Sequence, residues 1–125
     1  MLAHSRLQTI ILTSRIAEAE RFYTDVLGLR LRRHSNGHLI FDVGGSDLTL
    51  GRVPSTQPSE HTVAGFAVND LDGVVTELTR RGTTWQRIPG VSHDERGIAI
   101  TPDGDRVVWF RDPDGNLISI VQYVK

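Results

Sequence analysis

The stretch Ile16-Ala17-Glu18-Ala19-Glu20-Arg21-Phe22-Tyr23-Thr24-Asp25-Val26-Leu27-Gly28 decides how the chain folds. Its apolar residues recur at intervals of three and four, the spacing of one face of an α-helix. Ser14 is placed to cap the start of such a helix, and Gly28 to end it. We therefore predict an amphipathic helix over 16–27.

Short β-rich segments surround this helix and then repeat with a second helix. In the first half the predicted strands are Leu7–Thr13, Leu29–His34, Leu39–Val43 and Leu48–Val53. In the second half we predict strand Thr62–Val68, helix Leu71–Arg81 ended by Gly82, and strands Thr84–Ile88, Arg106–Arg111 and Leu117–Tyr123. The order is strand, glycine-terminated helix and three strands, twice.

This recurrence predicts one α+β domain over residues 1–125, built from two βαβββ modules. Module one covers about 6–53, a Pro/Ser/Thr-rich connector covers 54–60, and module two covers about 61–125. The insertion 89–105 is the main asymmetry, and Gly97–Ile100 within it is either an extra strand or a loop on the sheet.

Composition narrows the function classes. The chain has 125 residues, 14 Lys+Arg against 15 Asp+Glu, and no cysteine. Disulfides, thiolate zinc sites and cysteine nucleophiles are therefore excluded. The balanced charge argues against a nucleic-acid partner, and the apolar runs are too short to span a membrane. We expect a cytoplasmic protein.

Two motifs, in this order, resemble the vicinal oxygen chelate superfamily, which comprises glyoxalases, bleomycin-resistance proteins and extradiol dioxygenases. The motifs are Phe22-Tyr23 with Leu27-Gly28, and Asp112-Pro113-Asp114-Gly115-Asn116. The resemblance covers nearly the whole chain. It implies an open, half-closed mixed barrel made of the two modules, and a homodimer.

The resemblance also implies four positions that in the superfamily usually hold a divalent metal through two His or Gln and two Glu. Here those positions are Gln8, Thr49, Val63 and Ser119. One amide, two hydroxyls and a valine provide neither a carboxylate nor an imidazole, which is too little for such a cation. We therefore predict no metal and no other cofactor, and we expect the same four positions to line a ligand cavity.

Other residues leave alternatives open. A slipped register would bring His61 to Gln8 and restore a metal site, whereas the other histidines are expected at the surface. Phe41, Trp85 and Trp109 are possible walls of the cavity, or else plain core. Arg106 and Arg111 would favour an anionic ligand if either faced the cavity.

Three functions remain after this reading. The first is metal-independent binding of a small organic molecule in the cavity, as the resemblance to bleomycin-resistance proteins implies. The second is a lyase, isomerase or dioxygenase-like enzyme with reassigned catalytic groups or an off-register metal. The third is a regulatory domain whose cavity is vestigial, with Gly65 and Ala67 covered by aromatic side chains.

Overall fold

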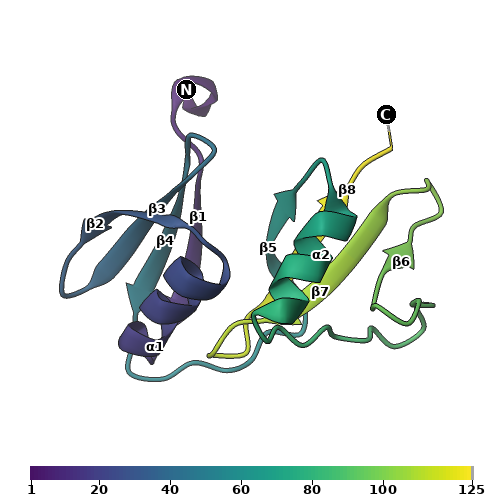
Figure 1. Ribbon diagram of the computed structural model, residues 1–125. Coiled ribbons are helices and arrows are strands. Elements are labelled where there is room, and N and C mark those ends of the chain that lie inside the picture. The colour runs from purple at the N-terminus through teal and green to yellow at the C-terminus, as the bar shows by residue number, and fades with distance from the viewer. Residues whose placement is uncertain (125) are drawn as a thin grey trace. The chain divides into compact units, whose positions relative to one another are not determined.

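The computed structural model describes residues 1–124. The chain divides into two compact units, with the boundary between Gln57 and Pro58. Both units have the order strand, helix, three strands (Figure 1). A short 3₁₀ turn, η1 (Leu2–His4), lies at the start of the first unit, before its first strand. The boundary between the units falls inside the segment 54–60, for which the sequence predicts a connector.

The first module is a four-stranded mixed sheet with a helix. Its elements are β1 (Gln8–Thr13), α1 (Ile16–Arg21), η2 (Phe22–Val26), β2 (Arg30–His34), β3 (His38–Val43) and β4 (Ser46–Arg52). The strand order is β1-β4-β3-β2, with β1 parallel to β4 and the other neighbours antiparallel.

The second module repeats this topology. Its elements are β5 (Thr62–Ala67), α2 (Leu71–Arg80), β6 (Ala99–Ile100), β7 (Arg106–Arg111) and β8 (Leu117–Gln122). The strand order is β5-β8-β7-β6, again with the first strand parallel to the last. The predicted α+β fold with two βαβββ modules is thus confirmed, and each sheet is open at its outer strands.

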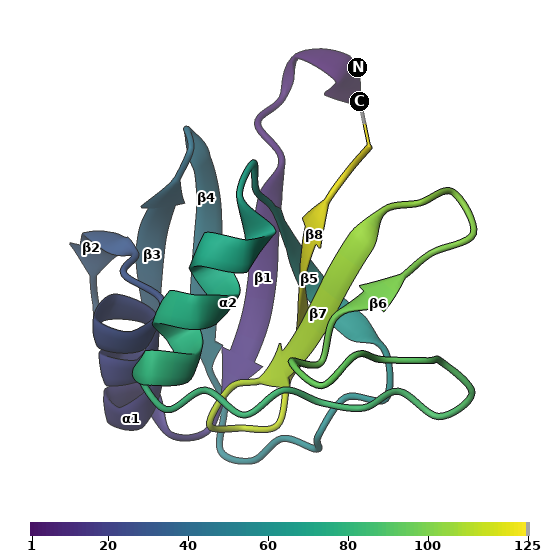
Figure 2. The ribbon, with the colours of Figure 1, turned by 45° about the vertical axis from the view of Figure 1, so that its right-hand side comes forward.

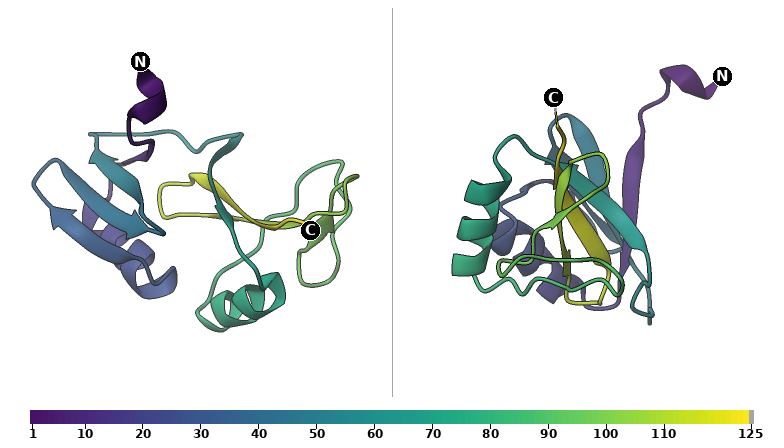
Figure 3. Two further views of the ribbon diagram at one scale, coloured as in Figure 1. Left: turned by 90° about the horizontal axis from the view of Figure 1, so that it is seen from above. Right: turned by 90° about the vertical axis from the view of Figure 1, so that its right-hand side faces the viewer.

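The helix of each module covers one face of its own sheet (Figure 3, left). In the first module, Tyr23 and Phe41 are fully buried and their rings lie 5.9 Å apart. In the second, α2 buries Leu71, Val75 and Leu78. We call the face of each sheet that lies opposite its helix the open face.

The helix after β1 differs in detail from the predicted helix. Its regular α-helical part ends at Arg21 and continues as a π-helical turn, in which the Leu27 amide donates to the Phe22 carbonyl. Its N-cap is Arg15, whose amide donates to the Thr13 hydroxyl, so the predicted cap by Ser14 is wrong. Gly28 ends the helix with a φ of 72°.

The predicted strand Thr84–Ile88 is wrong. This segment is not a strand, because it reaches the edge of β7 with one backbone hydrogen bond, from Gln86 N to Trp109 O. The edge of β7 is occupied instead by β6, which pairs Ala99 with Val107 (Figure 2). The open alternative at 97–100 is resolved, because Ala99–Ile100 supplies the missing strand of the repeat.

The connector joins the second module through a turn. The Asp112 carboxylate accepts hydrogen bonds from the amides of Asp114 and Asn116, which holds the turn before β8. Arg111 then donates to the carbonyl of Ser59, and the Ser59 hydroxyl accepts from the Leu117 amide. These contacts explain why the second unit starts at Pro58.

Candidate functional site

Gln8 and Thr49 lie together on the open face of the first sheet. Thr49 sits beside Ile10 in the parallel pairing of β1 and β4, two residue pairs along from Gln8 and on the same face. The Thr49 hydroxyl donates to Gln8 Oε1 at 3.2 Å. That oxygen is the only atom through which a glutamine ligates a hard cation. In this arrangement it already accepts a hydrogen bond, and the amide Nε2 is left as a donor.

The surroundings of this pair are apolar on one side. Ile10 and Leu12 alternate with Gln8 along β1 and remain 58% and 45% exposed. Ile11 and Thr13 point to the helix side and are buried. The open face therefore offers exposed apolar side chains next to a small polar pair, the usual composition of a ligand-binding surface.

Ser119 and Gly65 form the corresponding part of the second sheet. They are paired residues of β5 and β8, and an ideal Cβ at Gly65 would lie 2.9 Å from Ser119 Oγ. Only a glycine leaves the Ser119 hydroxyl room in its present rotamer. Val63, just before them, lies at a register irregularity between Thr62 and Ala64.

The three predicted wall aromatics lie in different places. Phe41 packs against Tyr23 on the helix side of the first sheet. Trp85 donates its indole N–H to Thr79 of α2 and meets Phe110 edge-on at 6.1 Å. Trp109 is the one of the three on an open face, as the cross-strand partner of Ser119.

His93 orders the surroundings of Trp109. Its Nε2 accepts from the Ile88 amide at 3.0 Å, and its Nδ1 lies 2.9 Å from the Gly97 carbonyl, which requires a proton on Nδ1. The ring meets Trp109 edge-on, with centroids 5.8 Å apart. From the sequence, His93 is expected in an exposed polar loop. The spacing of residues along the chain does not reveal that His93 contacts residues 88, 97 and 109.

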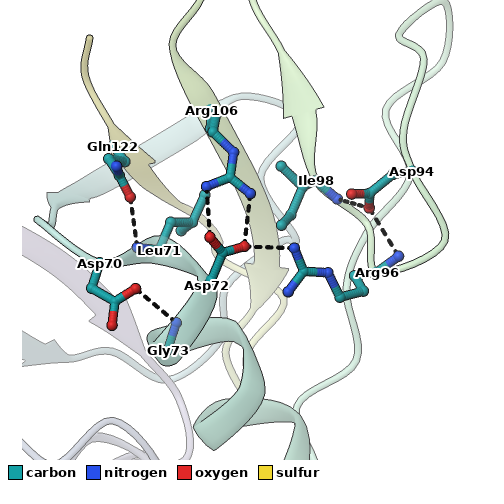
Figure 4. A network of polar contacts seen from close by, with 9 residues as sticks. All are labelled: Asp70, Leu71, Asp72, Gly73, Asp94, Arg96, Ile98, Arg106 and Gln122. Atoms are coloured by element: carbon teal, nitrogen blue, oxygen red, sulfur yellow. Dashed lines mark hydrogen bonds and ion pairs between the residues drawn. The ribbon is translucent and has the colours of Figure 1, made fainter. Parts of the chain in front are cut away.

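The carboxylates with shifted pKa values are held by arginines or by backbone amides. On α2, hydrogen bonds from Arg106 and Arg96 hold the pKa of Asp72 far below its usual range (Figure 4). On the first sheet, the guanidinium of Arg6 lowers the pKa of Asp47, with help from Arg32. Lowered pKa values make these groups weaker bases, the opposite of what a general base near neutral pH needs.

Arg106 and Arg111 are used structurally. Arg106 joins β7 to α2 through Asp72. Arg111 donates to the carbonyls of Ser59 and Gly115, at 2.8 and 2.6 Å. The sequence left open whether Arg106 or Arg111 binds an anionic ligand. Both guanidinium groups are instead occupied by contacts within the module.

A cavity of about 430 Å³ lies beside α2, lined by Val75, Thr76, Thr79, Trp85, Arg87, Glu95 and Arg96. Its polar groups are largely satisfied within the module. Arg87 donates to the carbonyls of Asp94 and Glu95, and Arg96 donates to Asp72. This cavity is therefore a weaker candidate for a binding site than the open faces.

The donor set at the four positions that the resemblance assigns to the site does not fit a divalent cation. Gln8, Thr49 and Ser119 contribute one amide oxygen and two hydroxyls, and Val63 contributes no donor. Within residues 1–124, no three His, Asp or Glu side chains gather in a metal-binding arrangement. His61 is exposed, immediately before β5.

Residues 5–120 match the model of the Glyoxalase/Bleomycin resistance protein/Dioxygenase superfamily. The chain belongs to this superfamily. A search of the curated proteins finds no match. No helix within the described part of the chain is long and apolar enough to cross a bilayer.

Solved structures of the glyoxalase superfamily share the fold. A member from Sphaerobacter thermophilus DSM 20745 is 23% identical, with a TM-score of 0.75, 98% of this chain covered and 100% of that chain. Lactoylglutathione lyase from Agrobacterium tumefaciens is 20% identical, with a TM-score of 0.73 and 95% and 93% covered. A superfamily protein from Alicyclobacillus acidocaldarius is 19% identical, with a TM-score of 0.72 and 98% and 93% covered. At these identities the similarity concerns the fold alone.

Proposed function

We propose that this glyoxalase-superfamily protein binds a small organic molecule without a metal ion and acts by sequestration rather than by Lewis-acid catalysis. The observation that carries the proposal is the hydrogen bond from Thr49 to Gln8 Oε1. It makes Gln8 and Thr49 a polar pair whose free amide N–H groups suit a ligand oxygen.

Apolar surface supports the same proposal. Ile10 and Leu12 stay exposed beside the polar pair, although burying such side chains is favourable by about 1.5–3 kcal/mol each. In the second module, Ser119 over Gly65 and the neighbouring Trp109 repeat the combination of a hydroxyl with apolar surface. We propose these two open faces as the ligand-binding surfaces of their modules.

The first test is metal content. Elemental analysis of the purified protein, together with thermal-shift titrations with Mg²⁺, Mn²⁺, Ni²⁺ and Zn²⁺, should find no stoichiometric metal and no specific rise in Tm. Stoichiometric metal that is lost in both Gln8→Ala and His61→Ala would overturn the proposal and establish the off-register metal enzyme. Arg15→Ala, on the helix side of the first module, is the matched control.

Ligand binding needs its own test. A fragment library screened by ¹H–¹⁵N NMR should shift amide resonances of β1 and β4, and Thr49→Val should weaken the hits while leaving the fold intact. Thr49→Val removes the hydroxyl and keeps the shape. Hits that shift only resonances outside the open faces, or that are insensitive to Thr49→Val and Ser119→Ala alike, would refute binding at these faces.

We also propose that the protein is a homodimer, because within residues 1–124 the outer strands β1, β2 and β5 each pair with a single neighbouring strand. Sedimentation velocity across a concentration series measures this directly. A single species at the mass of one chain, 13.9 kDa, would refute it.

A further inference from the structure

The strand register arranges the open face of the first sheet in rows that run across the four strands. One row contains, from β2 to β1, Arg33, Ile40, Thr49 and Ile10. The row beside it contains Arg30, Asp42, Asp47 and Gln8. Each row therefore has an arginine at the β2 edge.

The first of these rows has an apolar side chain on each side of Thr49. Ile40 separates Arg33 from Thr49, and Ile10 lies beyond Thr49 on β1. Adjacent strands are about 4.8 Å apart, so the Cα atoms of Arg33 and Thr49 are separated by about 10 Å. A ligand with an apolar body over Ile40 would therefore place its head group near the Arg33 guanidinium.

The charges on this face do not cancel. The Asp47 carboxylate, only 13% exposed, is shared by Arg6 and Arg32, with N–O distances of 3.1 and 3.0 Å. Among residues 1–124, the side chains of Arg30 and Arg33 make no hydrogen bond or ion pair. Asp42 is the remaining carboxylate on the face, and it lies across from Arg30 rather than Arg33.

A β-bulge produces this excess of cations. The pairing of β2 with β3 shifts between Leu31 and Arg33, so that Arg32 is the extra residue. Regular alternation would send Arg32 and Arg33 to opposite faces, but Arg32 reaches Asp47 on the open face, where Arg33 also lies. The bulge thus places Arg32 against Asp47 and leaves Arg33 free.

The neutral groups add two donors from Gln8, while the Thr49 hydroxyl oxygen keeps its acceptor lone pairs. The Thr49 hydroxyl proton is directed to Gln8 Oε1, which leaves the two N–H bonds of the Gln8 amide for a ligand. The uncommitted donors nearest the row of Arg33, Ile40, Thr49 and Ile10 are therefore a guanidinium and an amide nitrogen. Both call for oxygen atoms on the ligand.

We propose that the ligand of the first module is an organic anion, in which an apolar body lies over Ile10 and Ile40 and a carboxylate or similar oxyanion binds Arg33. This inference rests on the proposed ligand-binding function and adds the chemical class of the ligand. Arg33 is its specificity-determining residue, because a planar guanidinium pairs with an oxyanion through two parallel hydrogen bonds.

Three probes with the same apolar body separate head-group charge from burial. They are 3-phenylpropanoate, 3-phenylpropanamide and 3-phenylpropylamine, titrated at low ionic strength into the full chain with ¹H–¹⁵N NMR detection. The carboxylate should bind about tenfold or more tighter than the amide, because a charge-assisted hydrogen bond is about twice as strong as a neutral one. The amine should bind most weakly.

Variants assign this preference to one residue. Arg33→Gln should abolish the difference between carboxylate and amide, and Arg33→Lys should restore part of it. Arg21→Gln, which makes the same charge change on α1, should leave the preference unchanged. The dispersion of each variant's NMR spectrum shows whether it is folded.

The outcomes separate the two proposals. Equal affinity for the carboxylate and the amide, with shifts in β1 and β4, would overturn the anion preference and leave ligand binding standing. A preference that survives in Arg33→Gln would overturn the role of Arg33. If the carboxylate causes no shift on this face at millimolar concentration, the anion proposal fails, and the fragment screen alone decides whether the face binds ligands.

Discussion

A Cβ atom at Gly65 would lie 2.9 Å from the Oγ of Ser119. Ser119 is the second module's counterpart of Thr49. Because Gly65 has no Cβ, it leaves room for the Ser119 hydroxyl and thereby determines its direction. The two residues are adjacent in space because β5 pairs with β8 in parallel register.

Gly65→Ala should rotate the Ser119 side chain without unfolding the module. The residue next to the new methyl group is a short side chain with other rotamers, and Gly65 is exposed. We expect a change in Tm within about 2 °C and altered amide shifts at 119, with weaker binding of ligands that use Ser119. The double variant Gly65→Ala/Ser119→Ala is the control, since the effect of the alanine at 65 should vanish when Oγ is absent. An unchanged effect would show that Ser119 is not the group displaced.

Gly115→Ala should destabilise the second module by about 1–3 kcal/mol through backbone strain, with an added steric cost. Gly115 has a φ of +86°, and its ideal Cβ would lie 2.9 Å from Cβ of Pro58. Urea unfolding measures the loss. Gly82→Ala is the matched control: its φ is +95°, but nothing lies within 4 Å of its Cβ, so it reports strain alone. Equal losses in the two variants would contradict a role for Pro58.

Asp72→Asn should lower Tm at pH 7, and the gap to the wild type should close in acid. The hydrogen bonds from Arg106 and Arg96 lower the folded-state pKa of Asp72. A lowered pKa contributes stability that is complete above the unfolded-state pKa of about 3.9 and is lost as the pH falls through the folded-state value. Thermal melts from pH 7 to pH 2.5 should therefore show a constant gap down to about pH 5 and a shrinking one below about pH 4.

Asp103→Asn is the comparison for this titration, because Asp103 lies in an exposed turn and has no ion pair within residues 1–124. Its Tm should differ little from that of the wild type at each pH. High salt should also reduce the Asp72 gap, since the Asp72 side chain is half exposed. A gap that widens in acid would refute the assignment.

Phe41→Ala should cost about 3–5 kcal/mol, and Phe41→Leu much less. Phe41 is fully buried against Tyr23, so truncation leaves a cavity between sheet and helix. Such a loss approaches the total stability of about 5–15 kcal/mol of a small protein. Urea unfolding of both variants measures it. If Phe41→Ala instead left stability unchanged and weakened ligand binding, Phe41 would be a wall of the binding site and not part of the core.

Much of the fold follows from local pattern. The helices starting at Ile16 and Leu71, the hairpins around 35–37 and 44–45, and the turn at 112–116 all lie where spacing and turn residues predict them. Ser14 and Thr84–Ile88 show the limits. Whether Thr13 or Ser14 accepts a hydrogen bond at the start of the helix depends on how the chain leaves β1. Whether residues 84–88 join the sheet depends on β6, which pairs with the same edge of β7.

The sequence proposes positions for the candidate site but does not give their arrangement. The resemblance to the superfamily assigns Gln8, Thr49, Val63 and Ser119 to the site, and the absence of carboxylates at those positions is visible in the sequence. The hydrogen bond from Thr49 to Gln8 joins residues 41 positions apart, and the register that brings it about exists only in the folded sheet.

By itself the sequence determined the repeated βαβββ order, because helix and strand periodicity and turn chemistry act over a few residues. Only the tertiary structure decided which face each side chain occupies, that a bulge at Arg32 leaves Arg33 unpaired, and that His93 and Trp109 meet. Those outcomes depend on strand register and on contacts between distant segments. A shift of one residue in register would move every side chain of a strand to the other face.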